Sequence, residues 1–377
     1  MTGPPSSALS RRALRAAVEV ADAAGLRCER PVVLRDHTNL LAHLSPAAVV
    51  ARVATATAEM RRGDAWLARE VAVASSLADA GAPVVAPSRE LPPGPHHHDG
   101  LVLTFWELAE AVDAPLDARR AGRALRTCHE ALTGFPGELP PLAVLDEAED
   151  VVVRLAAEGV LDAGDAALLE GVGREVRARV AALALPWQAV HGDAHLRNVI
   201  TTSRGPLWND WEDTFLGPVA WDLGCLHASA RAFGHDPAAV AAAQEGYGPG
   251  VDDATLDACV EARRFQGTVW SLLIARRGIP GLVPPMTPAR PAAPTAISAG
   301  MSGMLCRGSA TNSMLSSVET AMIAASTAAT GSRRATASTR PASPSASTAR
   351  CTATNPGARV WNAVDHMRST LRRLMAA

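Results

Sequence analysis

Two neighbouring stretches, His191-Gly-Asp-Ala-His-Leu-Arg-Asn-Val-Ile200 and Trp208-Asn-Asp-Trp-Glu-Asp213, carry the pattern that decides the fold of this 377-residue chain. The residues that join them change from strand-forming to turn-forming types and back. Val199 to Thr202 favours a strand, Ser203-Arg204-Gly205 favours a turn, and Pro206 to Asn209 can run back beside the first strand. The pattern therefore predicts a short β-hairpin with polar residues at its open end.

Three oxygen-bearing side chains are expected to meet at that open end. If the chain folds about Arg204, Asn198 lies opposite Asp210, and Asp193 lies in the loop just upstream. A carboxylate and an amide carbonyl are hard ligands that suit Mg²⁺, which keeps other positions for water and phosphate oxygens. The remaining carboxylate, Asp193, is then placed to accept a proton from an attacking hydroxyl group.

Together with the downstream run Gly217-Pro-Val-Ala-Trp-Asp222-Leu, these stretches resemble the catalytic and metal-binding loops of the aminoglycoside phosphotransferase family. That family includes choline kinases and other small-molecule kinases, and it shares its architecture with protein kinases. The resemblance covers residues 191–223 and rests on the joint spacing of the motif HGDxHxxN with the later acidic residues. It implies an enzyme that uses ATP and Mg²⁺ to phosphorylate a small molecule.

Taken position by position, the resemblance implies roles for five residues. Asp193 matches the catalytic base, and Asn198 and Asp210 match the two Mg²⁺ ligands. His191 matches a loop histidine that acts as a structural hydrogen-bonding group. Asp222 matches the carboxylate that braces the catalytic loop.

The rest of the chain predicts an α+β, two-lobed, protein-kinase-like fold, with an antiparallel N-lobe sheet and a mainly helical C-lobe. Hydrophobic periodicity and breaker residues indicate the elements of the N-lobe. We expect helices at 11–25 (with Leu14, Val18 and Ala21 on one side) and 65–79, and strands at 31–44 (interrupted at Asp36-His-Thr-Asn39), 48–54, 84–87 and 101–106. From Asp117 onward helices dominate, beginning with the apolar stripe of Ala121, Leu125, Cys128 and Leu132.

The N-lobe supplies five candidate nucleotide-binding residues. Arg52 lies on a strand where kinases place the lysine that binds the α- and β-phosphates, and Glu70 lies on the next helix, where its ion-pair partner is expected. The chain contains no lysine, and a guanidinium can also bind phosphate. Thr38 and Asn39 stand in place of a Gly-rich phosphate loop, and Glu107 lies in a segment that resembles the adenine-binding hinge. An ordinary surface ion pair is the alternative for Arg52 and Glu70.

Composition divides the chain into five segments. Residues 1–24 are expected to form an N-terminal helix, 25–108 the nucleotide-binding N-lobe, and 109–284 the helical C-lobe with the catalytic hairpin. Residues 285–357 are of low complexity, rich in Ala, Ser, Thr, Pro, Gly and Arg, and are interpreted either as a disordered segment or as the product of a shifted reading frame. Residues 358–377 again show the pattern of an amphipathic helix.

Bulk properties exclude several classes of partner. A formal charge of −2 and a pI near 6.6 offer no polycationic face for nucleic acid. No run approaches the roughly 20 apolar residues that span a bilayer. The six cysteines form no CxxC pair or regular framework, which together with the lack of a signal-peptide pattern favours a cytoplasmic protein with free thiols. Oligomeric state is not predicted.

The function that these patterns favour is transfer of the ATP γ-phosphoryl group to a hydroxyl of an aminoglycoside-, choline- or sugar-like acceptor. A second interpretation is a catalytically impaired, kinase-like nucleotide-binding protein. A third is a metal-dependent hydrolase, because His191, Asp193 and His195 alternate and would face one side of an extended segment. The run His96-His-His98 is read as a solvated loop, and the acidic run Asp146–Asp150 as a solvated helix start or a contact for a cationic substrate.

Overall fold

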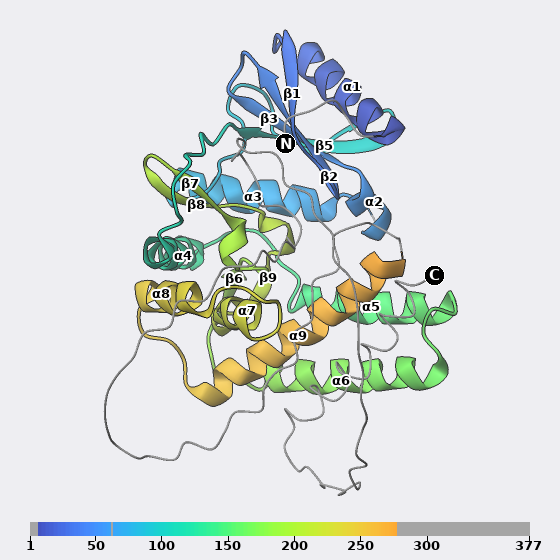
Figure 1. Ribbon diagram of the computed structural model, residues 1–377, viewed down its shortest axis with the longest axis vertical. Coiled ribbons are helices and arrows are strands. Elements are labelled where there is room, and N and C mark those ends of the chain that lie inside the picture. The colour runs from blue at the N-terminus through green and yellow to red at the C-terminus, as the bar shows by residue number, and fades with distance from the viewer. Residues whose placement is uncertain (1–6, 62, 277–377) are drawn as a thin grey trace, which may run out of the picture.

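The computed structural model describes residues 7–61 and 63–276, which form two lobes (Figure 1). The segments expected at 285–357 and 358–377, and the last residues of the expected C-lobe, lie outside the described residues. No helix in the described part of the chain combines the length and apolar character needed to cross a membrane.

The N-lobe is built on a five-stranded antiparallel sheet in the order β1-β2-β3-β5-β4. Its strands and helices are α1 Ala8–Ala23, β1 Arg30–Asp36, β2 Asn39–Ser45, β3 Val49–Ala54, α2 Ala56–Met60, α3 Ala65–Asp79, β4 His96–His98 and β5 Leu101–Glu107. Helix α1 covers the outer face of the sheet, and α3 lies between the sheet and the C-lobe (Figure 1).

Strand alternation decides which side chains of the sheet face the cleft. Val49, Ala51 and Val53 on β3 pack with α1 in one hydrophobic cluster. Because successive side chains on a strand point to opposite faces, Val50 and Arg52 face the other way, toward the C-lobe. The two-residue alternation of β3 therefore places the charged side chain of Arg52 on the inner face of a strand that is otherwise apolar.

The C-lobe is mainly helical and carries two small two-stranded sheets, the hairpin of β7 and β8 and the pair of β6 and β9 (Figure 1). Its elements are α4 Ala118–Leu132, α5 Ala143–Ala157, α6 Ala163–Ala181, β6 Trp187–Val190, η1 Leu196–Asn198, β7 Val199–Thr202, β8 Gly205–Trp208, η2 Trp211–Asp213, β9 Phe215–Pro218, α7 Ala220–Arg231, α8 Pro237–Tyr247 and α9 Asp253–Arg276. Helix α9 packs against α5, α6 and α7 and so forms the centre of the lobe. The stripe predicted on α4 is fully buried.

Three sequence-based expectations for the N-lobe need correction. Residues 84–87 form no strand, because Val84 and Pro87 make isolated bridges to different partners, Trp208 and Trp106. The histidine run His96–His98, expected as a loop, is the edge strand β4. On α1 the fully buried face consists of small residues, while Leu14 and Val18 are only partly buried, because close packing on the sheet favours alanine.

Candidate active site

The predicted hairpin forms, but its register differs by one residue from the expected one. Val199 pairs with Trp208, and the Asn209 amide donates to the Asn198 carbonyl at 2.9 Å. Asn198 therefore lies opposite Asn209 and not Asp210, because the turn consists of two residues, Ser203-Arg204, and is not centred on Arg204. Asp210 follows directly, in the left-handed conformation with φ of 67°.

The loop that precedes the hairpin is held by one buried carboxylate. Asp222, at the start of α7, accepts hydrogen bonds from the backbone amides of His191 at 2.7 Å and Gly192 at 2.9 Å. It also accepts one from His129 Nε2 on α4 at 2.8 Å. Gly192 has φ of 85°, and a Cβ there would lie 2.1 Å from the Asp213 carbonyl, so only glycine fits. The contact between His129 and Asp222 was not predicted from the sequence. His129 lies beside an apolar helical stripe, whose pattern indicates only packing.

His191 serves the loop as a hydrogen-bonding and stacking group. Its Nε2 donates to the Asn209 carbonyl at 3.0 Å, and its Nδ1 accepts from the Asp193 amide at 3.3 Å. The ring lies 4.5 Å from that of Trp211 and 5.5 Å from that of Trp208. With both nitrogens engaged, His191 is not available to a metal, and the described residues contain no group of three or more His, Cys, Asp or Glu side chains arranged to hold one. The hydrolase interpretation has no support in this geometry.

The Asp193 carboxylate lies between a cation and a neutral ring. Arg263, on α9, donates to one of its oxygens, and His195 Nε2 lies 3.5 Å from the other. The Asn198 amide fixes the backbone by donating to the Asp193 carbonyl at 3.0 Å. Burial raises the pKa of Asp193, and the charge of Arg263 opposes that rise. Arg263 was missed by sequence reasoning, because it lies far from the motif on a helix whose pattern indicates only packing.

Arg52 connects the two lobes. It donates to both oxygens of Glu70 at 2.7 Å, lies 3.4 Å from an Asp210 oxygen, and donates to Glu212. The Arg52 side chain is 4% exposed and that of Glu70 is 2% exposed, which overturns the reading of this pair as a surface ion pair. The residue expected to bind phosphate and a residue expected to bind metal therefore lie side by side.

A cavity between the lobes brings together part of the predicted nucleotide site. Ten residues line it: Leu41, Val50, Arg52, Glu70, Val85, Trp106, Glu107, Ala109, Ile200 and Asn209. Thr38 and Asn39 lie outside this lining. The Thr38 carbonyl accepts from the hydroxyls of Thr55 and Thr57, and the Thr38 hydroxyl is buried without a hydrogen-bond partner among the described residues.

The acidic residues after the hairpin suit a hard divalent cation by their chemistry. Asp210 offers a carboxylate and Asn198 an amide oxygen, and the backbone bond between Asn198 and Asn209 keeps their segments together. Such a mixed oxygen set is what Mg²⁺ takes from proteins. The residues present therefore fit the ion that the sequence implies.

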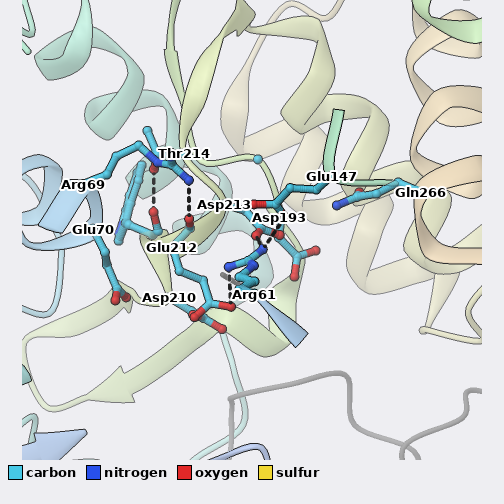
Figure 2. A network of polar contacts seen from close by, with 12 residues as sticks. Arg61, Arg69, Glu70, Glu147, Asp193, Asp210, Glu212, Asp213, Thr214 and Gln266 are labelled. Carbon is cyan, nitrogen blue, oxygen red and sulfur yellow. Dashed lines mark hydrogen bonds and ion pairs between the residues drawn. The ribbon is translucent and has the colours of Figure 1, made fainter. Parts of the chain in front are cut away.

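A second arginine of the N-lobe, Arg61, was not anticipated. It ends α2 and reaches Glu147 on α5 at 3.1 Å, Glu212 at 3.0 Å and Asp213. Figure 2 shows this cluster of charged side chains, with Asp193 close to Asp213. Burial acts to raise the pKa of Asp213, but the charge and hydrogen bond of Arg61 outweigh burial and lower it. Glu147 belongs to the acidic run Asp146–Asp150, for which the sequence allows two interpretations, a solvated helix start and a contact for a cationic substrate. In the structure Glu147 contacts the guanidinium of Arg61.

Comparison with known proteins identifies the relatives of this architecture. Residues 27–259 match the phosphotransferase enzyme family, APH. No curated protein matches the chain. Among solved structures, a choline/ethanolamine kinase family protein from Mesorhizobium loti is similar, with a TM-score of 0.51 and 21% identity over 72% of this chain and 88% of that chain.

Two further structures share the fold at lower identity. The amicoumacin kinase hAmiN, solved in complex with AMP-PNP, Ca²⁺ and Ami, has a TM-score of 0.53 and 13% identity over 68% of this chain and 85% of that chain. The choline kinase LicA from Streptococcus pneumoniae has a TM-score of 0.51 and 15% identity over 69% of this chain and 89% of that chain. At these identities the likeness concerns the fold.

Proposed function

The chain belongs to the phosphotransferase enzyme family, and on this premise we propose that it transfers the γ-phosphoryl group of ATP to a hydroxyl of a small molecule. The observation that carries the proposal is the meeting of Arg52 with Asp210 across the lobes, at 3.4 Å. A strand of the N-lobe supplies a phosphate-binding cation, and two neighbouring segments of the C-lobe supply a metal-binding carboxylate, Asp210, and a base, Asp193. The solved structure of the amicoumacin kinase hAmiN with AMP-PNP and Ca²⁺ supports a nucleotide with a divalent cation.

The proposal assigns a role to each of seven residues around the site. Asp193 takes the proton of the acceptor hydroxyl as the new oxygen–phosphorus bond forms and ADP leaves. Arg263 orients the Asp193 carboxylate, and Asp222 keeps the loop in place. Arg52, held by Glu70, binds the phosphates. Asn198 and Asp210 hold Mg²⁺, which when bound supplies positive charge against the phosphate oxygens.

The proposal also assigns regions. We assign nucleotide binding to residues 25–108, where Glu107 lines the interlobe cavity, and acceptor binding and catalysis to the helical lobe from 109 to 284. Thr38 and Asn39 would contact phosphate only after a rearrangement of their loop, since both side chains are buried. The four described cysteines are free thiols, which supports a reducing compartment such as the cytoplasm.

A thermal-shift titration with ATP, with and without Mg²⁺, tests the nucleotide site. We expect the protein to melt at a higher temperature with Mg·ATP, because a ligand that binds only the folded state stabilises it. Asp210→Ala should lose the Mg²⁺-dependent part of the shift. A cooperatively folded protein without any shift would contradict this proposal and the impaired, nucleotide-binding interpretation alike, whereas a shift without turnover would favour the impaired interpretation.

The Asp193→Asn variant tests the chemistry. Removal of the proton acceptor should lower turnover by about 10²–10⁴-fold, measured as ADP release in the presence of a hydroxyl acceptor. The Mg·ATP shift in melting temperature should persist, because Asp193 is not assigned to the nucleotide. Retained turnover would remove Asp193 from the mechanism.

A further inference from the structure

A second cavity lies between helix α3 of the N-lobe and helices α5 and α9 of the C-lobe (Figure 1). It measures about 450 Å³, within the range of about 300–1,000 Å³ that is usual for small-molecule sites. It shares no lining residue with the interlobe cavity that contains Arg52 and Glu70. This second cavity, which we call the α3–α5 cavity, therefore has room for a molecule other than the nucleotide.

The charged side chains that line the α3–α5 cavity carry an excess of positive charge. They are Arg61, Arg69, Arg154, Glu147 and Asp150. Arg61 and Glu147 form an ion pair at 3.1 Å, so their charges offset each other. Of the remaining groups two are positive, Arg69 on α3 and Arg154 on α5, and only the exposed Asp150 is negative. The lining of this cavity thus favours an anion over a second cation.

Arg69 is a cation that the protein does not match with a carboxylate of its own. Its Nη2 donates to the backbone carbonyl of Glu212 at 3.2 Å, and its Nε is buried without a hydrogen-bond partner. Among the residues that the structure describes, no carboxylate lies within ion-pair distance of the Arg69 guanidinium. Burial, followed by the charge of Arg61, lowers the pKa of Arg69, so its surroundings disfavour the charge that it carries.

The nearest carboxylates do not fill this need, because other arginines already hold them. Glu147, Glu212 and Asp213 attract Arg69 from beyond ion-pair distance, and each of the three is in contact with another guanidinium. A desolvated charge is costly unless it is paired. A ligand carboxylate would supply the missing partner, since its two oxygens match the parallel N–H donors of a guanidinium.

The other walls of the α3–α5 cavity are apolar. Trp66, in the first turn of α3, and Trp270, on α9, present indole rings, and Val151 and Val153 line the cavity from α5. Val153 is 58% exposed, so a hydrocarbon group seated against it would remove apolar surface from water. The cavity therefore combines an anion-binding group with walls that suit a hydrocarbon body.

The Arg69 end of the cavity adjoins the proposed base. The carbonyl that Arg69 contacts belongs to Glu212, and the next residue, Asp213, interacts electrostatically with Asp193. Figure 2 shows Arg69, Glu212, Asp213 and Asp193 in one network of polar contacts. A molecule anchored at Arg69 is thus placed to extend toward the group that receives the proton of the acceptor.

We propose that Arg69 anchors a carboxylate of the acceptor in the α3–α5 cavity, and that the acceptor is a hydroxy acid with an apolar body. This inference rests on the proposed phosphotransferase function and names its substrate class. The hydroxyl of the acid gives its proton to Asp193 while its oxygen bonds to the γ-phosphorus and the bond from that phosphorus to the leaving ADP oxygen breaks. Arg154 adds positive charge to the same cavity.

The test compares three alcohols that differ in charge. They are 3-phenyllactate, its neutral amide 3-phenyllactamide, and the cationic alcohol choline. Calorimetry measures their binding to the full chain at one ionic strength, which is set with sodium chloride. We expect 3-phenyllactate to bind at least tenfold more tightly than either of the other two, because only 3-phenyllactate brings a counter-charge for Arg69 together with an apolar ring.

Variants of Arg69 supply the second arm. Arg69→Gln should weaken the binding of 3-phenyllactate at least tenfold and leave that of 3-phenyllactamide unchanged, and Arg69→Lys, which keeps the charge without the paired donors, should lie between. Arg174→Gln is the matched control, because Arg174 lies on α6, is 71% exposed and lines neither cavity, so it should bind like the wild type. If Arg69→Gln does not melt cooperatively, Arg69→Lys and the three alcohols on the wild type decide the question.

The outcomes separate this inference from the proposed function. Equal binding of 3-phenyllactate and its amide, or tighter binding of choline, would overturn the inference, as would an Arg69→Gln variant that binds 3-phenyllactate like the wild type. A Mg·ATP shift in melting temperature would still support the phosphotransferase in each of these cases. Conversely, the absence of that shift contradicts the proposed function, while binding of 3-phenyllactate that depends on Arg69 would still establish the carboxylate subsite.

Discussion

On the C-lobe side of the candidate site, the catalytic loop is fixed by hydrogen bonds to backbone groups, whereas on the N-lobe side the contacts are ion pairs between side chains. Asp222 binds two backbone amides, and the Trp221 indole donates to the Gly192 carbonyl at 2.8 Å. Across the cleft, Arg52 contacts the carboxylates of Asp210 and Glu212, and Arg61 contacts those of Glu212 and Asp213.

This contrast indicates which side of the site depends on ligands for its stability. Backbone hydrogen bonds within one buried loop need no partner from outside, so the C-lobe side is already arranged for catalysis. Under the proposed function, the guanidinium groups of Arg52 and Arg61 face the carboxylates assigned to Mg²⁺ and occupy the place of the positive charge that Mg²⁺ would bring. The N-lobe side should therefore respond to ligands, and the C-lobe side should not.

The largest effect is expected at Asp222. Asp222→Ala removes the acceptor of two backbone amides and leaves the buried Nε2 of His129 without its acceptor, so that only the bond between His129 Nδ1 and the Tyr247 hydroxyl remains. Breaking such a buried arrangement costs about 3–5 kcal/mol, measured as the free energy of unfolding in urea. Turnover should be lost as well, and Mg²⁺ should not restore stability.

Asp222→Asn is the matched control for this change. The amide keeps one acceptor oxygen, so its loss of stability should be smaller. If Asp222→Ala unfolds at the same urea concentration as the wild type, another group holds the loop, and the contrast between the two sides of the site fails.

Sequence reasoning located the C-lobe side well because its residues are close in the chain. The strand-turn-strand pattern predicted β7 and β8, and the motif located Asp193 and Asn198 on adjacent segments. The one-residue error in register arose because a two-residue turn and a turn centred on Arg204 read alike in the sequence. Helix α3 was predicted with its observed bounds, since its apolar spacing and the following glycine leave no ambiguity.

The N-lobe side could be predicted only in part. Arg52 and Glu70 were predicted because they lie on neighbouring elements of the kinase-like pattern. Strand alternation places the Arg52 side chain in the cleft between the lobes. Arg61 and Arg263 make their contacts 152 and 70 residues away in the chain. Such contacts are fixed by the packing of α5 and α9 against the rest of the molecule, which periodicity does not encode.

Arg52→Gln tests the N-lobe side. The change leaves the carboxylates of Glu70, Asp210 and Glu212 facing one another without the guanidinium, so the metal-free protein should lose about 2–3 kcal/mol of stability. Mg²⁺ alone should restore part of this loss, because it supplies the missing charge. The measurement is the melting temperature of wild type and variant with EDTA and with Mg²⁺.

Equal responses of Arg52→Gln and Asp222→Ala to Mg²⁺ would contradict the division between a ligand-dependent and a ligand-independent side. The apparent KM for ATP provides an independent check. It should rise at least tenfold in Arg52→Gln, which corresponds to about 1.4 kcal/mol of lost phosphate binding.

The smallest expected effect is a loss of folding stability at acidic pH, which should arise first on the C-lobe side of the site. His235 contacts His195 edge to face with ring centroids 5.5 Å apart, and burial, followed by electrostatic repulsion between the two imidazoles when both are protonated, lowers the pKa of His235 to about 3. In the unfolded chain a histidine titrates near its ordinary value of about 6.5. Between these values the unfolded state binds more protons, so the stability contributed by neutral His235 is complete above about pH 6.5 and is lost as the pH falls toward 3. His235→Phe keeps an aromatic ring at this contact and removes this titration, so its unfolding free energy should fall by about 1.5 kcal/mol less than that of the wild type between pH 6.5 and 5. Parallel stability curves for the two proteins in urea titrations over that range would show that His235 is not the acid-sensitive group.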